Sequence, residues 1–172
     1  MFVIKWLVIV TVLLAIGAVV AGKLGFLQGT MPTDLGVRDG RLKPPSMTEN
    51  SVTSQAALYP DHPQRNYADI DPLSLKGDGP ATLAKIKAIV EGMDGAKVMK
   101  SDPGYLYVQF TSRLMKFVDD VEFWYDPAAN VIQVRSASRV GRGDLGVNRK
   151  RIEAVRAALV ATNLSPPRPP KP

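Results

Sequence analysis

The chain begins with its longest apolar run. Between Trp6 and Gly22 there are 17 consecutive uncharged residues, and Lys5 is the only charge in the first 22 positions. A helix needs about 20 mainly apolar residues to span a bilayer, with about 17 as the lower limit. The run therefore predicts a transmembrane helix or a long signal peptide with a small-residue cleavage site at 19–21. We favour a retained anchor, because the run exceeds the roughly 7–15 residues of a signal-peptide core.

Four stretches in the second half alternate apolar and polar positions with a period of two, which is typical of strands with one buried face. They read AKVMK, YLYVQFTS, DVEFWY and VIQVRSA, with the turn signals SDPG and DPAAN between them. The buried face would carry Leu106, Val108, Phe110, Val121, Phe123, Tyr125, Ile132 and Val134. Strands joined by such short turns predict an antiparallel sheet with one core face.

Two further stretches repeat apolar positions every three or four residues and predict helices on either side of the strands. The first runs from Pro80 to about Met93, because proline suits a first turn and Asp94-Gly95 ends the pattern. The second runs from about Asn148 to Ala161 and is stopped by the sequence SPPRPPKP. Asp144 or Asn148 can cap its start.

The order of these elements predicts an α+β fold: a four-stranded antiparallel sheet with two helices on one face, preceded by a transmembrane helix and an extended segment. We divide the chain into an anchor or signal segment (1–23), an extended linker partly packed on the domain (24–78), the α+β domain (79–163) and a Pro-rich tail (164–172). The second face of the sheet would expose Tyr105, Tyr107 and Trp124. We expect the preceding segment to cover these aromatic rings, with a ligand as the alternative.

The composition and the distribution of charge indicate where the protein is located and which part of the chain is basic. The chain has no cysteine, which excludes disulfides and cysteine metal sites. Its short N-terminal tail is typical of a signal anchor, although the positive-inside count does not favour export. We expect a single-pass protein of the inner membrane with its domain in the periplasm. Residues 135–156 hold seven basic and two acidic side chains, a net +5 of the chain's +6.

All of these charged residues except Arg156 lie in the stretch VRSASRVGRGDLGVNRKRIEAV, which joins a strand, a glycine loop and a helix start. Basic side chains in the first turn oppose the helix dipole unless an anion lies near. Either acids of the chain or an external phosphate or carboxylate could supply that anion. The candidate ligand-binding residues are Arg135, Ser136, Ser138, Arg139, Arg142, Asn148 and Arg149. The candidate structural ion pairs involve Asp119, Asp120 and Arg113.

Other chemistry is poorly supported by the residues. Asp119 and Asp120 are adjacent in a predicted strand, so they point to opposite faces and cannot easily share an acid–base site. His62 is the only histidine, and no metal centre or cofactor is expected. A hydrolase using Ser136 or Ser138 with Asp120 remains open, although the context lacks a nucleophile elbow. The predicted anchor argues against nucleic acid as a partner.

Three blocks in order carry a family resemblance: PTDLGVRDGRLKPPSMTENSVTSQA, SRLMKFVDDVEFWYD and VIQVRSASRVGRGDLGVNRKRIEAVRAAL. Together they resemble the bacterial and plastid family catalogued as domain of unknown function 1499, from about Pro32 to Leu159. A block that reads asparagine-cysteine-valine-serine-serine in the family is here Asn50 to Ser54, with Ser51 at the cysteine position. The resemblance implies a membrane-tethered or exported protein and brings no catalytic roles.

These observations leave three hypotheses. The first is a non-enzymatic envelope domain that binds an anionic small molecule, a lipid headgroup or a protein partner through its basic loop. The second is the serine hydrolase. The third is a structural network in which the arginines and aspartates hold the loop to the sheet and no ligand is needed.

Overall fold

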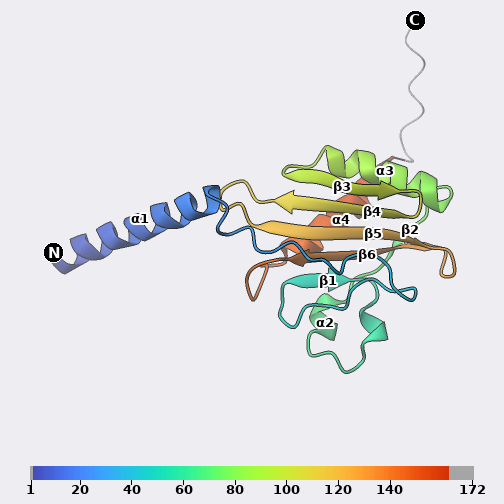
Figure 1. The fold of residues 1–172 in the computed structure, drawn as a ribbon, viewed down its shortest axis with the longest axis horizontal. Coiled ribbons are helices and arrows are strands. Elements are labelled where there is room, and N and C mark those ends of the chain that lie inside the picture. Colours follow the sequence, from blue (N-terminus) through green and yellow to red (C-terminus); the bar gives the residue numbers. More distant parts are fainter. Residues whose placement is uncertain (1, 163–172) are drawn as a thin grey trace, which may run out of the picture.

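The computed structural model describes residues 2–162, so the predicted Pro-rich tail lies outside the described residues. The first element is the helix α1 (Phe2–Lys23), which projects from one end of the domain (Figure 1). Its side chains are exposed along nearly all of its length. Within residues 2–162 it is the one helix long and apolar enough to cross a membrane. It is therefore a signal sequence or a single membrane anchor.

The domain is built on one antiparallel sheet in the order β1-β6-β5-β4-β3, with β2 also paired to β6. The four predicted strands are β3 (Ala96–Asp102), β4 (Tyr105–Thr111), β5 (Val118–Asp126) and β6 (Val131–Ser138). The prediction of a four-stranded sheet was wrong, because the sheet has six strands. The additional strands are β1 (Ser51–Thr53) and β2 (Leu73–Ser74), and both pair along the outer edge of β6.

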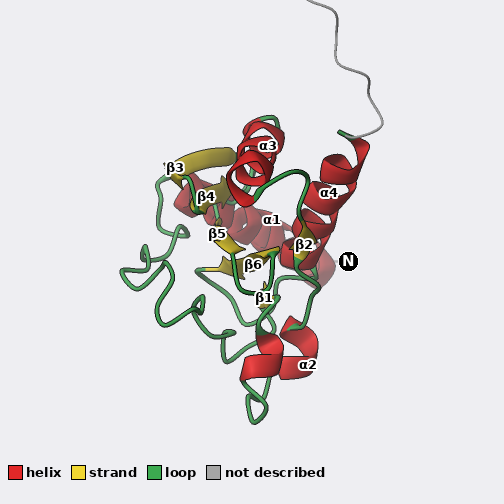
Figure 2. Cartoon of the chain, turned by 90° about the vertical axis from the view of Figure 1, so that its right-hand side faces the viewer, coloured by secondary structure: helices red, strands yellow, loops and turns green. Residues whose placement is uncertain are grey.

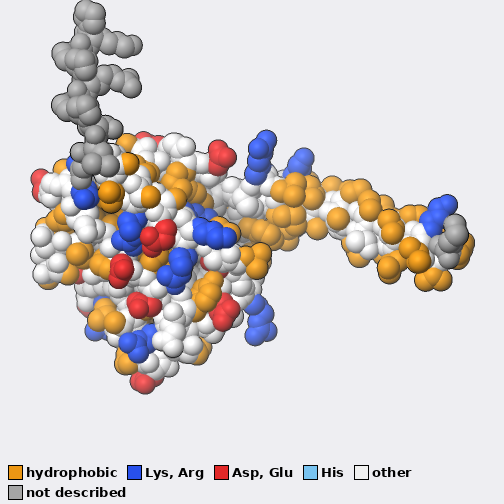
Figure 3. All heavy atoms as spheres, turned by 180° about the vertical axis from the view of Figure 1, so that it is seen from behind, with side chains coloured by type: hydrophobic (Ala, Val, Ile, Leu, Met, Phe, Trp, Pro, Cys, Tyr) orange, Lys and Arg blue, Asp and Glu red, His pale blue; other side chains and the backbone are white. Residues whose placement is uncertain are grey.

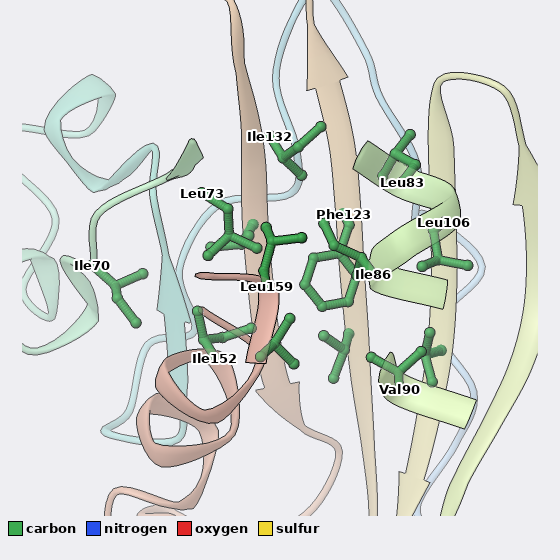
Figure 4. Close-up of a cluster of buried hydrophobic side chains, with 14 of the residues drawn as sticks. Ile70, Leu73, Leu83, Ile86, Val90, Leu106, Phe123, Ile132, Ile152 and Leu159 are labelled. Atoms are coloured by element: carbon green, nitrogen blue, oxygen red, sulfur yellow. The ribbon is translucent and has the colours of Figure 1, made fainter. Parts of the chain in front are cut away.

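Two helices pack on one face of the sheet, as predicted (Figures 1 and 2). They are α3 (Gly79–Glu91) and α4 (Val147–Ala161). Asp78 caps α3 by accepting a hydrogen bond of 2.7 Å from the amide of Ala81. Apolar side chains of both helices meet the strands around Phe123, which is fully buried (Figure 4). We call this face of the sheet the helix face.

The opposite face is covered by residues 29–46, which we call the covering segment and which cross in front of the sheet as the blue chain after α1 (Figure 1). Its Gly36 amide donates a hydrogen bond of 2.7 Å to Glu122 Oε1 in β5, and its Pro44 carbonyl accepts one of 3.3 Å from Arg135 Nε in β6. Between β1 and β2 lie the 3-10 turn η1 (Ala56–Leu58) and the short helix α2 (Arg65–Ala68). The segment before the domain is therefore packed on the sheet, and we call the covered side the segment face.

The last turn of α1 contacts the domain directly. Gly22 is buried, and a Cβ added to it would lie 2.4 Å from the carbonyl oxygen of Met115. Met115 belongs to the turn 112–117 between β4 and β5. That turn lies at the same end of the sheet as the loop 139–147 and the start of α4 (Figure 1). We call these three pieces the anchor-side end, and the turn 127–130 between β5 and β6 lies at the far end.

Candidate functional site

Asp119 and Asp120 are neighbours in β5 but serve opposite faces of the sheet, as the period of a strand requires. Asp119 pairs with Arg151 of α4 on the helix face, with Oδ2 and Nη2 2.5 Å apart. Asp120 pairs with Arg139 on the segment face, where Nη2 and Oδ1 are 2.7 Å apart. Acids of the chain thus form ion pairs with two of the basic residues in the loop and the helix start.

The Asp120 pair is part of a buried network. Arg139 Nε also donates to Asp120 Oδ2 at 2.8 Å, and the Tyr107 hydroxyl donates to Asp120 Oδ1 at 2.5 Å. The hydrogen bond with Asp120 raises the pKa of Arg139, against an opposing effect of burial. Burial and the hydrogen bond to Asp120 raise the pKa of Tyr107. The side chain of Asp120 is 2% exposed, so its charge is neutralised inside the protein rather than by solvent.

A second charged pair lies deeper on the same face. Glu122 is fully buried and Arg135 is 4% exposed, and their closest atoms are 3.7 Å apart. Glu122 Oε1 accepts hydrogen bonds from the Tyr105 hydroxyl and the Gly36 amide, both at 2.7 Å. Burial lowers the pKa of Arg135 despite the attraction of Glu122, and burial raises that of Tyr105. These groups tie the covering segment to the sheet, where a soluble ligand has no access.

The helix face holds a polar network around Asn148, which is fully buried at the start of α4. Its side-chain oxygen accepts from Ser136 Oγ at 2.6 Å and from Arg151 Nη1 at 2.8 Å. Its side-chain nitrogen donates to Ser138 Oγ at 3.0 Å and to the Asn50 carbonyl at 3.1 Å. The guanidinium of Arg151 also lies over the ring of Phe110, 4.6 Å from its centroid. Asn148 thereby joins β6, α4 and the residue that precedes β1.

The N-cap position of α4 is Gly146, and the side chain of Asp144, one of the two residues predicted to cap the helix, reaches its first turn from two residues earlier. Its Oδ2 accepts hydrogen bonds from the Asn148 amide at 3.0 Å and from the Asn148 side chain at 2.7 Å. Its Oδ1 accepts from the Gly146 amide and from the Tyr67 hydroxyl. Burial alone would raise the pKa of Asp144, but these hydrogen bonds outweigh it and lower the pKa. Burial together with the contact to Asp144 raises the pKa of Tyr67 to about 12.

The residues predicted to bind one anion are not brought together. Arg135 and Arg139 lie on the segment face, whereas Ser136, Ser138 and Asn148 lie on the helix face. Arg149 points toward α2 and donates to the carbonyls of Tyr67 and Asp69 at 2.6 and 2.8 Å. Arg142 is exposed in the loop. Arg113, predicted to form an ion pair, is exposed in the turn 112–117 and has no ion pair within residues 2–162.

The serines and the aspartate proposed for a serine hydrolase are also not placed together in the structure. Ser136 is fully buried, and its hydroxyl contacts Asn148 and Arg151, neither of which is a base. Asp120 lies on the opposite face of the sheet from Ser136 and Ser138. Within the described part of the chain, no three His, Cys, Asp or Glu side chains gather as a metal site would require.

A cavity of about 740 Å³ lies at the anchor-side end, between the turn 112–117 and the start of α4. Four of the side chains that line it are basic: Arg113, Lys116, Lys150 and Arg151. Asp94 and Asp119 are the acids of its wall, and Asp119 is already paired with Arg151. The wall also contains the apolar Met93, Phe110 and Val147. Lys150 and Arg151 belong to the basic stretch of the sequence, whereas no sequence pattern indicates that Lys116 lines the same cavity.

A smaller cavity of about 470 Å³ lies between the covering segment and the sheet, beside Tyr105, Tyr107 and Trp124. The covering segment forms one of its walls through Met31, Leu35 and Val37. These side chains cover much of the aromatic surface that the alternation of strand residues predicted. The cavity has one basic and one acidic side chain, Lys100 and Asp102, and they pair at 3.0 Å. The anchor-side cavity therefore carries the larger excess of positive charge.

Fold and site together define an α+β domain that follows an N-terminal apolar helix and has a basic cavity at the end nearest that helix. A family model described as a protein of unknown function (DUF1499) matches residues 41–159, more than half of the chain. The chain belongs to this family, as the sequence resemblance indicated, although the match begins nine residues later than Pro32. No curated protein and no solved structure matches the chain significantly.

Proposed function

We propose that the protein is a non-enzymatic binding module of the cell envelope, held at the inner membrane by α1, which takes an anionic group into the anchor-side cavity. In this proposal the domain lies on the periplasmic side of that membrane. One observation carries the proposal. Arg113, Lys116 and Lys150 line a cavity in which no carboxylate within residues 2–162 pairs with them.

Retention of α1 is supported by its contact with the domain. A helix of 22 residues is about 33 Å long, close to the roughly 30 Å of a bilayer's hydrocarbon core. Cleavage before Gly22 would sever the apolar helix at the point where it packs against Met115. A signal peptide that is removed needs no close fit between its last residue and the mature domain. The buried contact therefore favours an anchor over a cleaved signal.

Binding of an anion is supported by the surroundings of the basic side chains. Lys150 ends the first turn of α4 and Arg151 follows it, close to the helix start where the dipole adds positive potential and attracts anions. The charge of Arg151 is neutralised by its ion pair with Asp119, so the excess positive charge of the cavity comes from Arg113, Lys116 and Lys150. Lys150 is exposed, and Lys116 is partly exposed, so a ligand can reach both. Phosphate and carboxylate groups fit this chemistry.

The ion pairs on the sheet have a different role in this proposal. Arg135, Arg139 and Arg151 are each matched to one carboxylate and are at most 10% exposed in their side chains. A buried pair that is broken by loss of one partner is strongly destabilising. These pairs therefore hold the loop 139–147 and the covering segment on the sheet. The structural network and the anion site are separate features of one end of the molecule.

The proposal is tested with the full chain in micelles of a non-ionic detergent, titrated calorimetrically with inorganic pyrophosphate at low ionic strength. We expect saturable binding by the wild type and its loss in the double variant Lys116→Gln with Lys150→Gln. The matched control is Lys87→Gln with Lys97→Gln, which removes the same charge outside the cavity and should keep the binding. Absence of saturable binding in the wild type, or equal binding by both variants, would refute the proposal.

A further inference from the structure

We infer that the anchor-side end of the domain docks on the bilayer that α1 enters, and that the anionic group held in its cavity is the phosphate of an acidic phospholipid headgroup. This inference rests on the proposed anion site and names its ligand. It also predicts something that the proposed function does not require, which is contact between the lipid surface and loops that are remote from α1 in the sequence.

The position of the cavity relative to α1 is the first support. Gly22 lies in the last turn of α1 and packs on the Met115 carbonyl, so the turn 112–117 stands at the level where the helix leaves the bilayer. Lys23, the next residue, is the first charge after the apolar run. Because a helical turn rises only about 5.4 Å, no spacer separates the turn 112–117 from the membrane surface. The cavity opens beside this turn.

Exposed apolar side chains gather at the same end. Leu114 is 60% exposed, Leu145 is 94% exposed and Val147 is 46% exposed. They come from the turn 112–117, the loop 139–147 and the start of α4, which meet only in the fold. A single exposed leucine needs no explanation, whereas several on one end of a molecule indicate an interaction surface. The short connection of this end to an apolar helix indicates a membrane as the partner.

Basic side chains belong to the same end of the molecule as these apolar residues. Lys23, Arg113, Lys116, Arg142 and Lys150 all belong to the anchor-side end or to the last turn of α1. Figure 3, which shows the molecule from behind, has Lys and Arg side chains projecting on both sides of the root of the apolar helix. Positive charges next to apolar side chains are the usual composition of surfaces that lie on acidic lipid.

The acids of this end are largely neutralised within the protein. Asp119 and Asp120 are buried in ion pairs with arginines, and Asp144 is used to cap α4. Two exposed acids remain at this end: Asp94 of the cavity wall and Glu49, whose backbone pairs with Gly143. The end nearest the membrane therefore presents a positive surface to lipid headgroups. Burial of the other acids removes the repulsion that would oppose contact with negatively charged lipid.

The lining of the cavity distinguishes a lipid from a small soluble anion. Its basic side chains are combined with Met93, Phe110 and Val147 in the same wall. Inorganic phosphate would leave this apolar surface in contact with water. A phospholipid headgroup offers a phosphate for Lys116 and Lys150 and a less polar glycerol region for the apolar wall. The mixed lining thus fits a ligand that is partly apolar.

The test uses the full chain in nanodiscs of neutral phosphatidylcholine or of phosphatidylcholine with acidic phosphatidylglycerol. Because the chain has no cysteine, Leu145→Cys places one environment-sensitive dye on the loop, and Ala128→Cys places one at the far end of the sheet. Spin-labelled lipid quenches a dye that touches the bilayer. We expect several-fold stronger quenching at position 145 than at position 128 in acidic nanodiscs, and weaker quenching at 145 in neutral nanodiscs or at high salt.

Charge reversal provides the second arm. Lys116→Glu with Lys150→Glu, added to Leu145→Cys, should bring quenching in acidic nanodiscs down to the level seen with neutral lipid. Equal quenching at positions 145 and 128 of the otherwise wild-type chain, which needs no charge variant to fold, would overturn the docking. Pyrophosphate binding in detergent without lipid-dependent quenching would overturn this inference and leave the proposed function standing. Absence of saturable pyrophosphate binding by the wild-type chain in detergent would instead refute the proposed function itself.

Discussion

Arg139 donates hydrogen bonds to both carboxylate oxygens of Asp120, with its Nε 2.8 Å from Oδ2 and its Nη2 2.7 Å from Oδ1. The two side chains are 7% and 2% exposed, so neither charge is solvated. A two-point pair of this kind fixes orientation as well as distance. Since Arg139 follows directly after β6, the pair anchors the start of the loop 139–147 to the middle of the sheet.

We expect Arg139→Met to lower the free energy of unfolding by about 3–5 kcal/mol, because it leaves the Asp120 carboxylate buried without a counter-charge. Urea unfolding of the full chain in detergent, followed by near-UV circular dichroism, measures this. Arg142→Met is the control, since Arg142 is exposed in the same loop and its loss should cost within about 0.5 kcal/mol. Similar losses for the two variants would show that the pair adds no stability.

Asn148 is the second position at which we expect a large loss. Its buried side chain satisfies Ser136, Ser138 and Arg151 at once. Asn148→Ala leaves several of these groups without partners, and each such group costs about 1–3 kcal/mol. The total loss should exceed that of Ser138→Ala, which removes one partner at a partly exposed position. Equal unfolding midpoints of the two variants in urea would contradict a central role for Asn148.

The period of two in the strand sequences was sufficient to predict the long strands and the opposite directions of Asp119 and Asp120. The strands β1 and β2 were missed because three and two residues are too short to show a period. Their pairing depends on the free edge of β6, which lies about 60 to 85 residues away in the sequence. No local pattern could predict that edge.

The candidate site was predicted less well for a related reason. The charge count located the basic stretch, but it could not say which arginines the acids of β5 would neutralise. Arg135 and Arg139 share a face because they are four residues apart in and after β6, whereas Ser136 belongs to the other face. The anchor-side cavity is lined by both Lys116 and Lys150, which are 34 positions apart in the sequence. Only the packing of the turn 112–117 against α4 brings them together.

Low pH should weaken the stabilisation that the Asp144 carboxylate gives to the start of α4. The pKa of Asp144 is lowered in the folded protein, so its contribution to stability is present above the unfolded value of about 3.9 and is lost as the pH falls through the folded value. The difference in unfolding free energy between wild type and Asp144→Asn should therefore be largest near neutral pH and shrink below about pH 4. Urea unfolding at a series of pH values measures it.

Tyr67→Phe offers a separate check on the same cap. It removes the hydroxyl that donates to Asp144 and helps to lower the pKa of that carboxyl. The acid-unfolding midpoint should then move to higher pH, because the folded carboxylate takes up a proton more easily. A midpoint that is unchanged in Tyr67→Phe, together with a difference for Asp144→Asn that does not depend on pH, would contradict the assignment of Asp144 as a charged cap.

The contact between α1 and the domain depends on a glycine. A Cβ at Gly22 would lie 2.4 Å from the carbonyl oxygen of Met115, a distance that real Cβ atoms essentially never show. Gly22→Ala therefore requires either the last turn of α1 or the turn 112–117 to move. Gly17→Ala is the matched control, because nothing lies within 4 Å of a Cβ at that position.

We expect trypsin to cleave after Lys23 faster in Gly22→Ala than in the wild type, when both are held in neutral nanodiscs and followed by mass spectrometry. The reason is that cleavage needs the backbone at the junction to open, and the packed contact with Met115 resists opening. Gly17→Ala should be cleaved at the wild-type rate. If Gly22→Ala is cleaved no faster, the junction is not held by this contact, and the position of the anchor-side end at the membrane would need another support.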